Sequence, residues 1–138
     1  MLIHSEQEML EFGQQYAHAH AAPLILELVG DVGAGKTTFV RGLAQGIGVK
    51  EAVTSPSFTI SKIYRGKDAT LVHYDFYRLA DPGIMQEDLA ESISDPQTIT
   101  VIEWGESIQD VLPPERKIIE IKYVDENTRE LIERWNSI

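Results

Sequence analysis

The sequence LILELVGDVGAGKT runs from Leu24 to Thr37 and joins an apolar segment to a glycine-rich turn. Its first six residues are almost continuously apolar, which predicts a short strand buried on both faces. The next eight, Gly30 to Thr37, match the pattern G-x-x-x-x-G-K-[ST] of a phosphate-binding loop. From Phe39 to Ile47 apolar residues recur along one side of a helix. The strand and helix on either side favour a phosphate-binding loop over a flexible glycine-rich turn with a surface lysine.

Each residue type in this loop has a physical task. Glycines let the backbone curl so tightly that several N–H groups converge on a polyphosphate. The helix that follows directs its positive end to the same point. Lys36 adds a full charge near the outer phosphates, and the Thr37 hydroxyl is a ligand for Mg²⁺.

The rest of the chain alternates between strand and helix patterns. Ser5-Glu6-Gln7-Glu8 has the form of a capping box and opens a helix that fades by Pro23. Strands are expected at 60–64, 70–75, 98–103 and 117–124, and helices at 85–90 and 125–135, with the first two strands paired as a hairpin. This order predicts an α/β fold of the P-loop NTPase type, with a central mixed, largely parallel sheet flanked by helices. At this length we expect one domain, residues 1–138.

Composition limits the function classes. The 138 residues carry 22 Asp and Glu against 12 Lys and Arg, a formal net charge of −10, and no cysteine. An acidic surface repels nucleic-acid backbones and anionic lipid, which argues against nucleic-acid binding by the chain alone. The apolar runs are too short for a membrane span, and the first residues lack the pattern of a secretory signal. We therefore expect a soluble, cytoplasmic protein.

Two acids stand where predicted strands end, and a phosphate loop needs an acid for its magnesium shell. Asp75 ends one strand and Glu103 ends another, and the pattern does not choose between them. His73 is expected to serve in packing. Trp104 is expected to be a core aromatic, with its ring on the opposite face of the strand from Glu103. Arg78 suits phosphoryl charge and a surface ion pair equally well.

Four segments, taken in order, resemble a known family. They are GDVGAGKTT at 30–38, TSPSFT at 54–59, HYDFYRL at 73–79 and VIEWGE at 101–106. Together they are similar to the bacterial TsaE ATPases, which take part in making threonylcarbamoyladenosine, the modified base beside the tRNA anticodon. The resemblance covers nearly the whole chain. The His-x-Asp-x-Tyr-Arg element joined to Ile-Glu-Trp is more specific than the phosphate loop alone.

The resemblance implies a role for each matching residue. Thr37 and Glu103 would complete a Mg²⁺ site, and Asp75 would be a second acid, close to the γ-phosphate and needed for hydrolysis together with Lys36. Residues 55–59 would form a switch loop that responds to the γ-phosphate. The ATP-binding residues implied in this way are Glu6, Gly30, Asp31, Gly33, Ala34, Gly35, Lys36, Thr37, Thr38 and Arg129.

The leading hypothesis is a Mg²⁺-dependent ATPase subunit of a tRNA-modification complex. By resemblance its partners are the TsaB and TsaD proteins, and tRNA is reached only through that complex. The alternative is a small P-loop kinase that phosphorylates a metabolite or nucleotide, although 138 residues leave little room for an acceptor site and a lid. A third possibility, a nucleotide-binding module without catalysis, requires Asp75 and Glu103 both to be structural.

Overall fold

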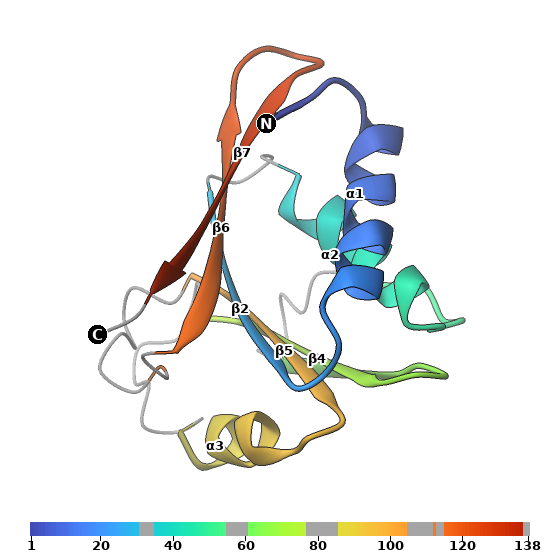
Figure 1. The fold of residues 1–138 in the computed structure, drawn as a ribbon, viewed down its shortest axis with the longest axis vertical. Helices are drawn as coiled ribbons and strands as arrows, with labels where there is room; N and C mark the ends of the chain where they lie inside the picture. Colours follow the sequence, from blue (N-terminus) through green and yellow to red (C-terminus); the bar gives the residue numbers. More distant parts are fainter. Residues whose placement is uncertain (31–34, 55–60, 77–85, 105–111, 113–114, 137–138) are drawn as a thin grey trace.

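A twisted sheet runs through the centre of the molecule, with helices on both of its faces (Figure 1). The computed structural model describes residues 1–30, 35–54, 61–76, 86–104, 112 and 115–136. Within these residues the strands are β1 (Leu2–Ile3), β2 (Leu24–Val29), β3 (Ser61–Arg65), β4 (Thr70–Asp75), β5 (Thr98–Glu103), β6 (Arg116–Tyr123) and β7 (Arg129–Asn136). The helices are α1 (Glu6–Ala19), α2 (Lys36–Gly46) and α3 (Gln86–Ser94).

The sheet is mixed, with a parallel centre and antiparallel edges. Its strand order is β1-β7-β6-β2-β5-β4-β3. Strands β6, β2, β5 and β4 run parallel to one another, whereas β3, β7 and β1 pair antiparallel to their neighbours. The expected mixed, largely parallel sheet is therefore confirmed. Because parallel strands end at the same edge, the carboxyl ends of β2, β4 and β5 lie together there.

Two apolar clusters hold the layers together. The larger cluster lies between the sheet and helices α1 and α2 and includes Leu26, Phe39 and Val101. The smaller lies on the α3 side and includes Tyr74 and Ile102. Neighbouring residues of one strand thus enter different clusters, which explains why all of β5 is buried and why β2 and β5 are so rich in apolar residues.

Helices α1 and α2 approach each other at glycines. A Cβ atom built on Gly42 would collide with the carbonyl oxygen of Leu10, and one on Gly13 would lie 2.5 Å from the carbonyl oxygen of Phe39. The missing side chains let the two backbones touch. This close packing fixes α2, and with it the start of α2 at the edge of the sheet.

The N-terminal capping box is confirmed. The backbone N–H of Glu8 donates to the Ser5 hydroxyl oxygen at 3.0 Å, and the Glu8 carboxylate accepts from the N–H of His4 at 2.7 Å. The expected hairpin is also present, as β3 and β4. Helix α3 is described from Gln86 and extends to Ser94, beyond the expected end at Ala90, while Met85 lies outside the described residues.

The expected terminal helix at 125–135 is wrong. A turn occupies 125–128, where Thr128 donates its backbone N–H to the carbonyl oxygen of Asp125 at 3.2 Å, and β7 then pairs antiparallel with β6. Several of its residues favour helices, but pairing with β6 and burial of Leu131 override that local preference. No helix in the part of the chain that the structure describes is long and apolar enough to cross a membrane.

Candidate functional site

The start of α2 forms the centre of the site. Gly35 caps the helix with a φ of +104°, in the left-handed region that glycine adopts without strain. Lys36, Thr37 and Thr38 form the first turn, where backbone N–H groups have no partner within the helix. The predicted phosphate-binding residues Asp31, Gly33 and Ala34 lie outside the described residues.

Lys36 is held inward as a buried cation. The residue is only 6% exposed, and its Nζ donates a hydrogen bond to the carbonyl oxygen of Gly30 at 2.5 Å. The same ammonium lies 3.9 Å from the centroid of the Trp104 ring, within cation–π range. The charge is thus fixed beside the end of β2, facing the start of its own helix.

Two acids end the strands beside β2. Asp75 of β4 and Glu103 of β5 are direct partners in the parallel register, and Glu103 is also the partner of Leu28 on β2. Glu103 is buried and Asp75 half-buried. Side chains alternate between the two faces of the sheet, and Val101 and its partner His73 lie on the face that carries α2. Asp75 and Glu103 are each two positions further along the same strands, so both lie on that face as well. The structure brings together the two acids that the sequence pattern left as alternatives.

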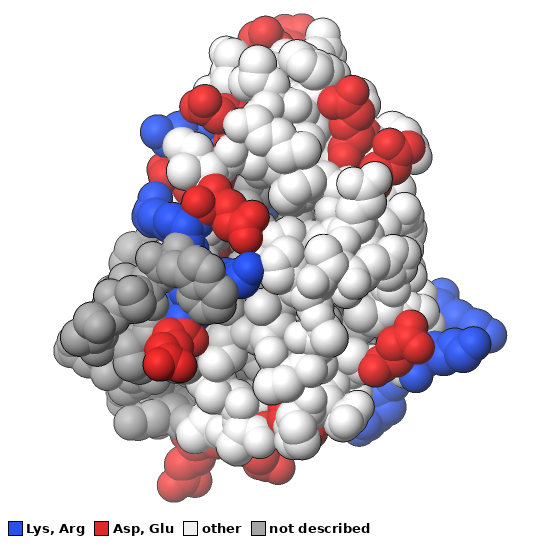
Figure 2. Space-filling view, in the orientation of Figure 1, with Lys and Arg blue, Asp and Glu red and all other residues white. Residues whose placement is uncertain are grey.

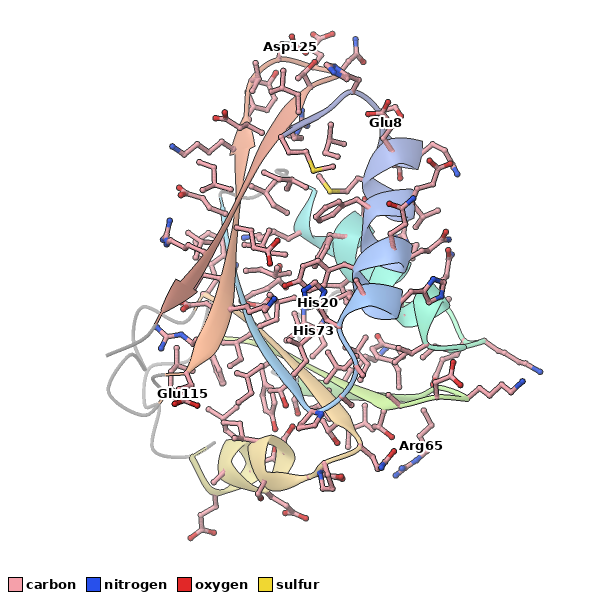
Figure 3. The ribbon with its side chains drawn as sticks, viewed as in Figure 1. Glu8, His20, Arg65, His73, Glu115 and Asp125 are labelled. Atoms are coloured by element: carbon pink, nitrogen blue, oxygen red, sulfur yellow. The ribbon has the colours of Figure 1, made fainter. Side chains whose placement is uncertain are left out.

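His73 does more than fill space. Its Nε2 lies 2.7 Å from Oε2 of Glu103, and both side chains are almost completely buried. Figure 3 shows His73 in the middle of the molecule, between the sheet and helices α1 and α2. The expectation of a packing role missed this contact. The available signal was the spacing: His73 precedes Asp75 by two residues, so both side chains share one face of β4.

The expectations for Trp104 are wrong. Its backbone has a φ of +58°, because β5 ends at Glu103 and the alternation of a strand no longer applies. The ring turns toward Lys36 on the same side as Glu103, and the residue is half-buried rather than a core aromatic.

A second part of the site is a pocket of about 400 Å³ beside the start of α2. It is enclosed by the first residues of the chain, by α1, and by the turn between β6 and β7. In Figure 3 the labelled Glu8 and Asp125 mark the two sides of this end of the molecule. The pocket brings together four predicted ATP-binding residues: Glu6, Gly35, Thr38 and Arg129.

The β6–β7 turn holds Arg129 in place. Its Nη1 donates to the carbonyl oxygens of Asp125 at 2.7 Å and Thr128 at 3.1 Å, and the guanidinium lies 4.6 Å from the Tyr123 ring centroid. The Asp125 carboxylate accepts a hydrogen bond from the backbone N–H of Asn127, which stabilises the turn. This hydrogen bond also lowers the pKa of Asp125. Glu6 lies 3.8 Å from Arg41 and is otherwise open to solvent.

Some candidates fall outside the structure's description. The expected switch loop at 55–59 and Arg78 are among them, so their predicted roles stay predictions.

A lysine and a threonine that open a helix after a central parallel strand, with acids on two strand ends beside it, define a P-loop-type α/β protein. The crystal structure of Bacillus subtilis YdiB has the same fold, with a TM-score of 0.80 and 33% sequence identity, covering 95% of this chain and 80% of that one. The family model for the threonylcarbamoyl adenosine biosynthesis protein TsaE matches residues 3–131. This chain belongs to the TsaE family.

Relatives from several bacteria agree with this assignment. The tRNA threonylcarbamoyladenosine biosynthesis protein TsaE of Haemophilus influenzae is 37% identical over 97% of this chain and 89% of its own length. The protein of the same name from Treponema pallidum is 35% identical over 92% of this chain and 93% of its own length. The Bacillus subtilis protein of that name is 42% identical over 78% of this chain and 66% of its own length.

Proposed function

We propose that residues 1–138 form a single ATPase domain that binds and hydrolyses Mg²⁺-ATP for threonylcarbamoyladenosine modification of tRNA. One observation carries this proposal. Lys36 and Thr37 open α2 at the edge of the sheet where Asp75 and Glu103 end neighbouring parallel strands. The relatives, named for this biosynthesis, supply the process in which we place the activity.

ATP would bind across the start of α2. Lys36 is the charge for the outer phosphates, and the backbone N–H groups of Lys36 to Thr38 at the start of the helix are suited to binding them. The pocket bounded by Glu6 and Arg129 adjoins the same helix end, so it is suited to the nucleoside part of the ligand. A single nucleotide would need both parts, and their closeness at the start of α2 supports the proposal.

The residues present fit a magnesium ion. Mg²⁺ prefers oxygen ligands and takes one or two protein groups together with the phosphates of its nucleotide. The Thr37 hydroxyl and the Glu103 carboxylate are such ligands. Oε2 of Glu103 receives its hydrogen bond from His73, while Oε1 has no hydrogen-bond donor among the residues that the structure describes. When bound, the ion would neutralise charge that develops on the phosphates.

Asp75 is the group we propose for hydrolysis. It is half-buried at the strand end next to Glu103, on the sheet face that carries α2. A carboxylate there can accept a hydrogen bond from a water molecule and orient its oxygen toward the γ-phosphorus. Attack by that water breaks the bond to the ADP oxygen and releases inorganic phosphate.

Partner proteins complete the proposal. We expect TsaB and TsaD to bind this chain in the cytoplasm and to hold the tRNA, which the chain itself meets only through the complex. In Figure 2, acidic side chains are spread over the visible face, while Lys and Arg form small groups at its sides. The net charge of −10 favours protein partners over direct contact with the tRNA backbone.

The test follows the phosphate. The chain is incubated with γ-labelled ATP and Mg²⁺, alone and with TsaB and TsaD, and the label is separated into inorganic phosphate and organic products. We expect inorganic phosphate, and little of it with Lys36→Ala. Label on a metabolite or nucleotide would favour the kinase alternative, and absence of turnover under every condition would contradict the ATPase proposal.

A further inference from the structure

We infer that His73 is a positioning residue that fixes the carboxylate of Glu103 so that its second oxygen faces the magnesium site. This inference rests on the proposed function, because it assumes that Glu103 is a ligand of Mg²⁺. It adds a residue outside the predicted ATP-binding and metal-binding set.

His73 and Glu103 make a short, buried contact. His73 is fully buried on β4 and Glu103 is 3% exposed at the end of β5. Nε2 and Oε2 are 2.7 Å apart, a short distance for a hydrogen bond to a carboxylate. An ionised carboxylate can only accept, so the hydrogen lies on Nε2 of the ring.

The His73 ring has no other polar contact among the described residues. Nδ1 of His73 is buried and has no hydrogen-bond partner in the part of the chain that the structure describes. A buried polar atom without a partner costs free energy, so a ring that served packing alone would be better replaced by an apolar one. Within the described ranges, the one polar contact of the His73 side chain is with the proposed metal ligand.

The same contact orients the other oxygen of Glu103. A glutamate has three rotatable side-chain bonds, and without a partner its carboxylate samples several directions. The hydrogen bond to Oε2 removes that freedom and leaves Oε1 without a donor among the described residues. Groups behind a metal ligand orient it in this way, and their loss typically weakens metal binding about 10- to 100-fold.

Two substitutions of similar chemistry separate positioning from packing. In His73→Gln the amide nitrogen can reach the place of Nε2 and still donate to Glu103. In His73→Asn the shorter side chain places its amide near the position of Nδ1, which has no partner. The measurements are Mn²⁺ binding in the presence of ADP, followed by electron paramagnetic resonance, and the Mg²⁺ concentration for half-maximal ATP hydrolysis.

We expect His73→Asn to weaken Mn²⁺ binding and raise the Mg²⁺ requirement by about tenfold or more, with metal-free ADP binding in EDTA unchanged. His73→Gln should recover most of the loss. Thr100→Val is the matched control: it removes a partly buried 2.8 Å hydrogen bond to Ser92, on the same strand as Glu103 but on the opposite face, and should leave metal binding unchanged. Thermal unfolding of each variant reports the folded fraction.

The outcomes distinguish this inference from the function on which it rests. If Glu103→Gln weakens Mn²⁺ binding but both His73 variants bind like the wild type, the role of His73 is overturned and the metal site stands. If His73→Gln loses as much as His73→Asn, or if His73→Asn weakens metal-free ADP binding equally, the effect is structural and the inference is wrong. If Glu103→Gln binds Mn²⁺ normally, the proposed ligand and the inference fail together.

Discussion

Lys36 shows how a single buried charge can be prepared for a ligand. Its ammonium rests on the Gly30 carbonyl oxygen and against the Trp104 ring, and both contacts compensate a cation that is almost out of water. Phosphate oxygens at the start of α2 would provide a much stronger partner than either. The residue is therefore held beside the start of α2, where we propose that the phosphates bind.

Lys36→Ala should weaken ATP binding roughly 10- to 100-fold and abolish turnover, because a charged hydrogen bond contributes about 1.5–3 kcal/mol. Titration of the purified variant with ATP by calorimetry measures the affinity. Arg65→Ala, a change of an exposed cation on β3, is the control and should bind ATP normally. Wild-type affinity and turnover in Lys36→Ala would contradict the phosphate-loop assignment.

Glu103→Gln should raise the Mg²⁺ concentration for half-maximal hydrolysis by about tenfold, or about 1.4 kcal/mol, and leave binding of metal-free nucleotide nearly unchanged. The change keeps the volume of the side chain and removes its charge, so a packing role predicts little effect. Mg²⁺ titration of steady-state hydrolysis is the measurement. An unchanged Mg²⁺ requirement would leave Asp75 as the remaining strand-end acid for the ion.

At the scale of elements, the position of α2 depends on its contact with α1. Gly13 and Gly42 leave no space for a methyl group between the two backbones. The first turn of α2 is therefore carried by a tightly packed helix pair. Substitutions far from the nucleotide can disturb the site through this contact.

Gly42→Ala should destabilise the fold by about 1–3 kcal/mol, since the new Cβ collides with the Leu10 carbonyl oxygen and the helices must separate. Chemical denaturation followed by circular dichroism gives the free energy of unfolding. His18→Ala, at an exposed position of α1, controls for substitution within a helix and should change stability little. Equal stability of both variants would show that the helices separate without cost.

Strands β2 and β6 are joined by a buried ion pair. Nε of Arg116 lies 2.8 Å from Oε1 of Glu27, and both side chains are about 5% exposed. A buried pair is costly to break because the remaining charge loses its counterion. The two paired residues are 89 positions apart along the chain, so β2 and β6 depend on each other for stability.

Arg116→Met should cost about 3–5 kcal/mol in the free energy of unfolding, because it removes the cation that faces the buried Glu27 carboxylate. Adding Glu27→Leu should recover much of that loss. Arg134→Met breaks the more exposed pair with Glu120 and should cost at most about 1 kcal/mol. Similar losses in Arg116→Met and Arg134→Met would mean that burial does not determine how much these ion pairs contribute to the free energy of unfolding.

For the molecule as a whole, its net negative charge and its phosphate-loop motif together predict nucleotide-dependent binding of protein partners. The tagged chain should capture TsaB and TsaD from its host's lysate more strongly with ATP than without nucleotide. If nucleotide controls docking, the γ-phosphate must change a surface that the partners contact. The measurement is quantitative mass spectrometry of the captured proteins.

Lys36→Ala is the control for this capture and should lose its ATP dependence. Recovery of TsaB and TsaD to the same extent with and without ATP would separate nucleotide binding from partner binding. Recovery of neither protein would contradict the proposed complex.

Local patterns predicted the elements that form from neighbouring residues. The Ser5 cap, the apolar runs of β2 and β5 and the β3–β4 hairpin all follow from interactions within a few positions, and each is present where expected. The choice between helix and strand at 129–136 did not follow from local preference. It depended on the free edge of β6 and on space for Leu131 in the core, neither of which is a local property.

The same division holds for the site. The motif identified Lys36 and Thr37, and the strand ends identified Asp75 and Glu103, because loops and strand ends are marked in sequence. Three other features bring together segments that are far apart in the chain. They are the hydrogen bond between His73 and Glu103, the cation–π contact of Lys36 with Trp104, and the pocket lined by Glu6 and Arg129. Residue spacing reports which side chains share an element, whereas packing of elements against one another determines which of them meet.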